Sequence, residues 1–161
     1  MFEIFAETGS YAFYTAVAMT ALYFICAFFF DMYYLSIPWT TISITAYVCI
    51  AIYLFLSSSP AVIFARVISA LALFGLFYLS ARFFDSGGGD AIVLPMLALL
   101  WGIINAAFII LIGCLITTFI VILRALIKHE KIAWRANYPL LPGISVSYIV
   151  FIIIYFGTML F

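Results

Sequence analysis

The chain of 161 residues is 70% hydrophobic and only 7% charged, and its formal net charge is zero. A fold of this size in water cannot hide so much apolar surface, because small domains leave a large part of their area exposed. The composition excludes a water-soluble domain, and the charge balance gives no basic face for nucleic acid. We expect a single membrane domain over residues 1–161, surrounded by lipid.

Apolar stretches separated by short polar segments predict an all-α, polytopic membrane protein with about six transmembrane helices, since one crossing needs about 20 residues. The expected spans are residues 11–30, 39–56, 61–84, 91–104, 106–124 and 143–161. The acidic start of the chain does not suit a cleavable signal, so the first span is expected to be retained. Gly102 and Asn105 suggest the break between the fourth and fifth spans. One long helix there would instead move the C-terminus to the other side.

The distribution of basic residues predicts the orientation of the spans. With six spans, the connections after the first, third and fifth lie on one side. That side carries Arg82, Arg124, Lys128, Lys131 and Arg135. Because basic residues favour the cytoplasm, we expect this side of an inner membrane to be cytoplasmic and both termini to lie outside. Arg66 and Arg82 lie near the two ends of the third span, where both can extend to the interface.

Two aspartates at the expected membrane boundary are candidate catalytic residues. Asp31 ends the first span, where the helix dipole and the apolar neighbours both oppose a negative charge. Its alternative role is an interfacial residue that stops the helix. Asp90 opens the fourth span and could be only an N-cap. It follows Gly87, Gly88 and Gly89, whose bare backbone could pair with an extended peptide.

Two carboxyls that meet can share a proton and activate water for attack on a peptide bond, as in aspartic proteases. The helix ends predict that Asp31 holds the proton and donates it to the scissile carbonyl, while Asp90 takes the proton from water. The reverse assignment stays open, because the titration belongs to the pair. Asp85, which precedes the glycines, is expected to be a bystander.

The two aspartate segments resemble the motifs of type IV prepilin peptidases, a family of GxGD membrane aspartic proteases. Asp31 is followed six and seven positions later by Ile37 and Pro38, and Gly87-Gly88-Gly89-Asp90 matches GxGD. The likeness covers the chain from about residue 11 to its C-terminal end.

The likeness is greatest to the small, peptidase-only branch, which includes tight-adherence pilus peptidases and archaeal preflagellin enzymes. Residues 139–145 are loosely similar to the proline–glycine start of the family's last helix. The chain departs from the family pattern at Trp39, where Asn or Asp is frequent, and at Ile92, where Lys is common.

The resemblance implies an endopeptidase that removes leader peptides from prepilin-like proteins at the cytoplasmic face, typically after a glycine. Longer members carry a cytoplasmic domain that accompanies N-methylation. This chain has no such segment, so we expect cleavage without methyl transfer and without a metal or other cofactor. The expected partners are prepilin-like substrates and membrane lipid, and the oligomeric state is left undetermined. Two alternatives remain: a silent membrane subunit or small transporter with the glycine loop as a hinge, and a degenerate peptidase that binds pilins without cutting them.

Overall fold

The computed structural model describes residues 2–34, 41–84, 90–128 and 140–159, and this part of the chain is almost entirely helical. It contains the helices α1 (Phe2–Tyr34), α2 (Thr41–Ser57), α3 (Pro60–Phe84), α4 (Asp90–Trp101), α5 (Ile103–Lys128) and α6 (Leu141–Met159). The all-α prediction is therefore confirmed for the described part of the chain.

Four helices are long and apolar enough to cross a membrane. The candidate spans are Tyr11–Asp31 in α1, Pro60–Phe83 in α3, Ile103–Ile127 in α5 and Leu141–Thr158 in α6. α2 and α4 are also apolar but have only 17 and 12 residues. A helix as short as α4 rises about 18 Å, against about 30 Å for the hydrocarbon core of a bilayer. The membrane character is supported, and the count of six spans stays a prediction.

The first helix is longer at both ends than the span expected at residues 11–30, because it begins at Phe2 and ends at Tyr34. This helix continues to Tyr34, so Asp31 lies in its last turn and does not end it. The physical reason is local: the three residues after Asp31 include no Gly or Pro that would interrupt helical backbone.

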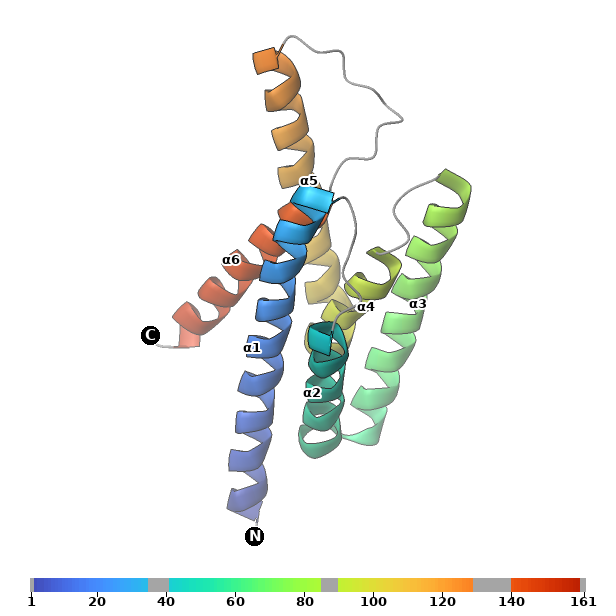
Figure 1. Cartoon of the computed structure of the whole chain (residues 1–161). Coiled ribbons are helices and arrows are strands. Elements are labelled where there is room, and N and C mark those ends of the chain that lie inside the picture. Colours follow the sequence, from blue (N-terminus) through green and yellow to red (C-terminus); the bar gives the residue numbers. More distant parts are fainter. Residues whose placement is uncertain (1, 35–40, 85–89, 129–139, 160–161) are drawn as a thin grey trace.

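The break between α4 and α5 is a single residue, Gly102, whose φ of 79° is left-handed. A Cβ at this position would meet nothing within 4 Å, so the backbone conformation, and not crowding, favours glycine. The chain turns back at this point, and α4 and α5 diverge from it in a V (Figure 1). Of the two residues predicted for the break, Gly102 is correct and Asn105 lies inside α5.

α4 is the central helix of the bundle. Nine of its 12 residues are buried, and it packs mainly on α3 and α5. The other extensive contacts join α1 to α2, α5 to α6 and α1 to α6. α3, by contrast, exposes large apolar side chains such as Phe64, Leu71 and Leu76. Such an apolar outer face suits lipid as the surroundings.

The C-terminal ends of α1, α3 and α5 point toward the same end of the bundle, which is the upper end in Figure 1. This agrees with the expected placement of the connections after these three helices on one side. The assignment of that side to the cytoplasm stays a prediction.

Candidate functional site

The two candidate catalytic residues are distant in sequence, but the fold brings them together. Asp31 lies in the last turn of α1, and Asp90 is the first residue of α4. These two helices are in contact. The carboxyls are close enough that the charge of Asp31 raises the pKa of Asp90. The structure therefore places the two acids in one site.

Asp31 is held by the N-terminus of α6. Its side chain is 8% exposed, and its Oδ2 accepts a hydrogen bond of 3.2 Å from the backbone N–H of Leu141, the first residue of α6. A side-chain acceptor at a helix N-terminus satisfies a free N–H group and meets the positive end of the helix dipole. This contact favours the ionised form of Asp31.

Asp90 is partly buried at the N-terminus of α4, outside the four candidate spans. Burial, and then the charge of Asp31, raise the pKa of Asp90 from 3.8 to about 7. A carboxyl with such a pKa exchanges its proton near neutral pH, which is the property that a general acid or base requires.

The structure adds a contact that the proton assignment expected from the sequence did not include. That assignment gave the proton to Asp31, because the C-terminal end of its own helix opposes a charge. In the structure, the N–H of Leu141, 110 positions away, stabilises the Asp31 carboxylate. Asp90 is the carboxyl whose pKa reaches the neutral range. The Leu141 contact favours the reverse assignment, with the proton on Asp90, which the sequence left open.

A side chain from α2 holds the first turn of α4, close to Asp90 in sequence. Tyr47 on α2 donates a hydrogen bond to the carbonyl of Ile92. Sequence analysis missed this contact, because a tyrosine in an apolar span is ordinarily a packing residue.

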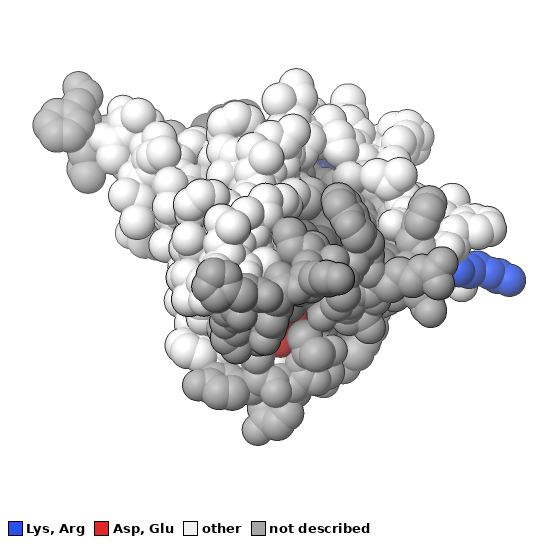
Figure 2. All heavy atoms as spheres, turned by 90° about the horizontal axis from the view of Figure 1, so that it is seen from above, with Lys and Arg blue, Asp and Glu red and all other residues white. Residues whose placement is uncertain are grey.

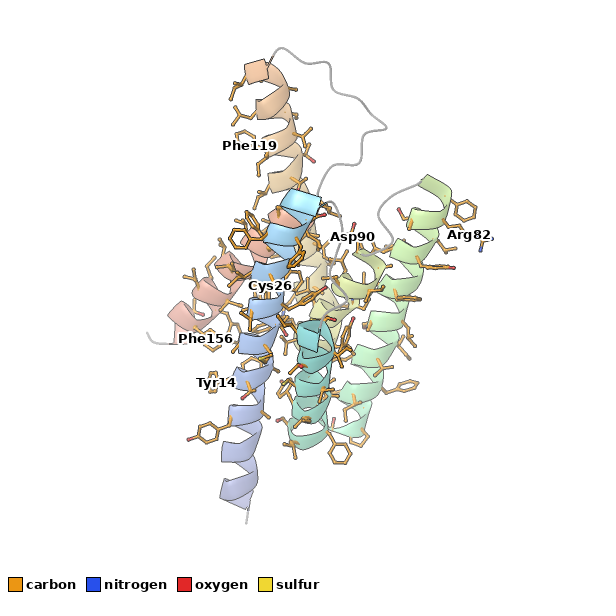
Figure 3. All side chains as sticks on the ribbon, in the orientation of Figure 1. Tyr14, Cys26, Arg82, Asp90, Phe119 and Phe156 are labelled. Atoms are coloured by element: carbon orange, nitrogen blue, oxygen red, sulfur yellow. The ribbon has the colours of Figure 1, made fainter. Side chains whose placement is uncertain are left out.

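The two carboxyls face the upper end of the bundle. Figure 3 shows Asp90 inside this end and Arg82 of α3 pointing away from the bundle. Viewed from above, acidic atoms are visible near the middle of the face in Figure 2. They belong to Asp31 or Asp90, because the structure describes no other Asp or Glu side chain.

The other motif residues cannot be placed. Ile37 and Pro38, which follow Asp31 in the motif, and the three glycines 87–89 lie outside the described residues. Ile92, the position that departs from the family pattern, is partly buried on α4.

A close crossing of α5 and α6 fixes the N-terminus that holds Asp31. A Cβ added to Gly113 would lie 2.6 Å from the Cα of Ile144, and one added to Gly143 would overlap Thr117 and the carbonyl of Gly113. Helices approach this closely only where small residues meet. On the other side of α6, Ser145 Oγ donates a 2.9 Å hydrogen bond to the carbonyl of Phe24 in α1.

The site and fold define a helical membrane protein with two interacting carboxyls at one end of its bundle. Among the described residues, no three His, Cys, Asp or Glu side chains gather as a metal site would require. No family model, curated protein or solved structure matches this chain.

Proposed function

We propose that this protein is a membrane aspartic endopeptidase of the prepilin-peptidase type, with Asp31 and Asp90 as its catalytic residues. One observation carries the proposal: the two acids that the sequence motifs select interact electrostatically from separate helices. Two acids next to each other in largely apolar surroundings are costly, and ionisable residues in such positions are usually functional.

The proposed reaction uses one water molecule and no other reactant. The Asp31 carboxylate takes a proton from the water as its oxygen attacks the peptide carbonyl, while Asp90 donates its proton to the carbonyl oxygen. The tetrahedral intermediate then collapses: the C–N bond breaks, the proton on Asp31 passes to the departing amine, and one hydroxyl of the intermediate returns its proton to Asp90 as the new carboxyl forms. The Leu141 N–H supports this assignment, because it favours Asp31 as the base.

The substrate class comes from the resemblance to prepilin peptidases. We assign prepilin-like proteins as substrates, with removal of a short basic leader peptide at the cytoplasmic face of the inner membrane and without N-methylation. In this proposal α2 and α4 are two further membrane segments, Asp90 lies at the boundary, and both termini lie outside. The five basic residues expected at the Asp31 end of the bundle support this orientation.

Single substitutions of the two acids test the proposal. The protein is co-expressed with a prepilin-like substrate, and Asp31→Asn and Asp90→Asn are each expected to abolish cleavage while membrane insertion is retained. Asp85→Asn is the matched control, since it removes an acid from the same connection as the GxGD motif and should leave cleavage intact. Full processing by either dyad variant would reject the proposed chemistry.

A small transporter is the second candidate, and the break at Gly102 favours it. Discontinuous helices build the substrate sites of many transporters, because their free ends can bind ions and polar groups. Two results together would support this candidate. The inserted wild-type protein would cleave no prepilin-like substrate, and it would carry a proton-coupled flux that Asp90→Asn abolishes.

A further inference from the structure

Arg66, for which the sequence indicated a side chain able to extend to the interface, contacts backbone carbonyls of α4. It lies near the start of α3 and turns into the bundle, where its Nη1 donates hydrogen bonds to the carbonyls of Leu99 (3.1 Å) and Leu100 (2.7 Å). The guanidinium carbon also lies 5.7 Å from the ring centroid of Tyr53 on α2. Arg82, on the same helix, points away from the bundle (Figure 3).

The two carbonyls that Arg66 binds belong to the broken end of α4. A helix leaves its last carbonyls without intrahelical partners. Gly102 N–H donates to the carbonyl of Ala98 at 2.9 Å, and Asn105 Nδ2 donates to that of Trp101 at 3.1 Å. The carbonyls of Leu99 and Leu100, which lie between these two positions, accept hydrogen bonds from Arg66. Because unpaired carbonyls are costly in apolar surroundings, these contacts hold the chain reversal in place.

We propose that Arg66 is a positioning residue: by holding the C-terminal end of α4, it fixes where Asp90, at the other end of this helix, lies against Asp31. α4 has only 12 residues, and nine of them are buried, so a shift at its C-terminal end displaces the packed segment as a whole, although Pro95 removes one of its internal hydrogen bonds. The expected effect of Arg66 on cleavage rests on the proposed function. The expected effect of Arg66 on the Asp31–Asp90 pair does not, because the two carboxyls can be titrated without a substrate.

The proposal is tested by infrared titration of the purified full-length protein with ¹³C-labelled aspartate, reconstituted in lipid. The wild-type Asp90 band should have a midpoint near its pKa of about 7. Arg66→Met keeps a long apolar side chain and removes the donors, so α4 loses its anchor. Its midpoint is expected to fall toward 3.8 as Asp90 moves away from Asp31 and from its buried position. Arg82→Met is the matched control and should titrate like the wild type.

Cleavage kinetics give the second measurement. Arg66→Met is expected to lower kcat by about a hundredfold with little change in KM, because small misplacements of reacting groups reduce the rate without loss of binding. A wild-type protein that cleaves no prepilin-like substrate would reject the proposed function, while the infrared midpoint would still test Arg66.

An inserted Arg66→Met protein with the wild-type midpoint would overturn the proposal. If this variant does not insert, Arg66→Gln decides, because its shorter side chain still carries an amide donor but cannot reproduce both guanidinium contacts. We expect a smaller fall in its midpoint, and an unchanged midpoint in Arg66→Gln would overturn the proposal equally.

Discussion

The two ends of α4 differ in the charged side chains that they meet. Asp90 opens the helix, where the dipole is positive, and Arg66 binds its last carbonyls, where the dipole is negative. At the C-terminal end, one cation binds two neutral carbonyls. At the N-terminal end, Asp90 interacts with a second acid, Asp31, which also accepts a hydrogen bond from the first residue of α6. Each acid suits its own helix N-terminus, but capping does not require the two to lie near each other.

The largest expected effect is on the pH dependence of cleavage, which tests the N-terminal end of α4. Asp90 must hold a proton to act as the acid, and its pKa is raised to about 7. Its protonated fraction therefore falls as pH rises through 7. We expect kcat/KM to drop by about tenfold for each pH unit above this value. Rates measured from pH 6 to 9 check this, and a flat profile over that range would contradict the assignment.

The crossing of α5 and α6 should be the next most sensitive feature. Gly143→Ala places a Cβ against Thr117 and the backbone of Gly113, and the N-terminus of α6, which holds Asp31, must then move away from α5. We expect a loss of about 1–3 kcal/mol in the free energy of unfolding, as for other overpacked contacts. Denaturant unfolding in mixed micelles measures it. Gly157→Ala, also in α6 but with open space around it, is the control and should unfold like the wild type.

A smaller loss of unfolding free energy is expected at the chain reversal between α4 and α5, where the backbone conformation is left-handed. Gly102→Ala forces a side chain into left-handed backbone, which costs about 1–2 kcal/mol. Gly75→Ala in α3 has equally open surroundings but replaces a helical glycine, so it should be neutral or stabilise by up to about 1 kcal/mol. Equal unfolding midpoints for the two variants would show that the φ of Gly102 is not what the reversal depends on.

The smallest expected effect concerns the first turn of α4. Tyr47→Phe removes the hydrogen bond to the carbonyl of Ile92 and should cost about 0.5–1.5 kcal/mol of unfolding free energy. Tyr78→Phe on the exposed face of α3 is its control, since that ring is half exposed and stacks on Phe74. If Tyr78→Phe lost as much unfolding free energy as Tyr47→Phe, the hydrogen bond to Ile92 would not be the cause of the loss.

The sequence was sufficient for the helices because their limits are set locally. Apolar runs separated by glycine, proline and charged residues predict the limits of α2 to α6 to within a few residues, whereas α1 begins at Phe2, well before the expected start at residue 11. Gly102 marks the reversal inside the continuous apolar run. The pairing of Asp31 with Asp90 could also be anticipated, since both follow from motifs on one expected membrane face.

The surroundings of the two acids could not be read from the sequence. Leu141 contributes only a backbone N–H, and nothing in its neighbourhood shows that α6 begins beside Asp31. Arg66 could equally have extended to the interface, and only the packing of α3 on α4 turns it inward. The number of spans is likewise not fixed by composition, because α2 and α4 are apolar but short.

The glycine contact between α5 and α6 has a consequence for how a peptide could reach the acids. The backbones of α5 and α6 are in close contact at Gly113 and Gly143, so we expect these two helices to move together as one rigid unit. Widening the gap between Asp31 and Asp90 must then come from the tilt of α1 or α4 against it. A covalent link between α5 and α6 should leave turnover unchanged, whereas one between α1 and α4 should stop it.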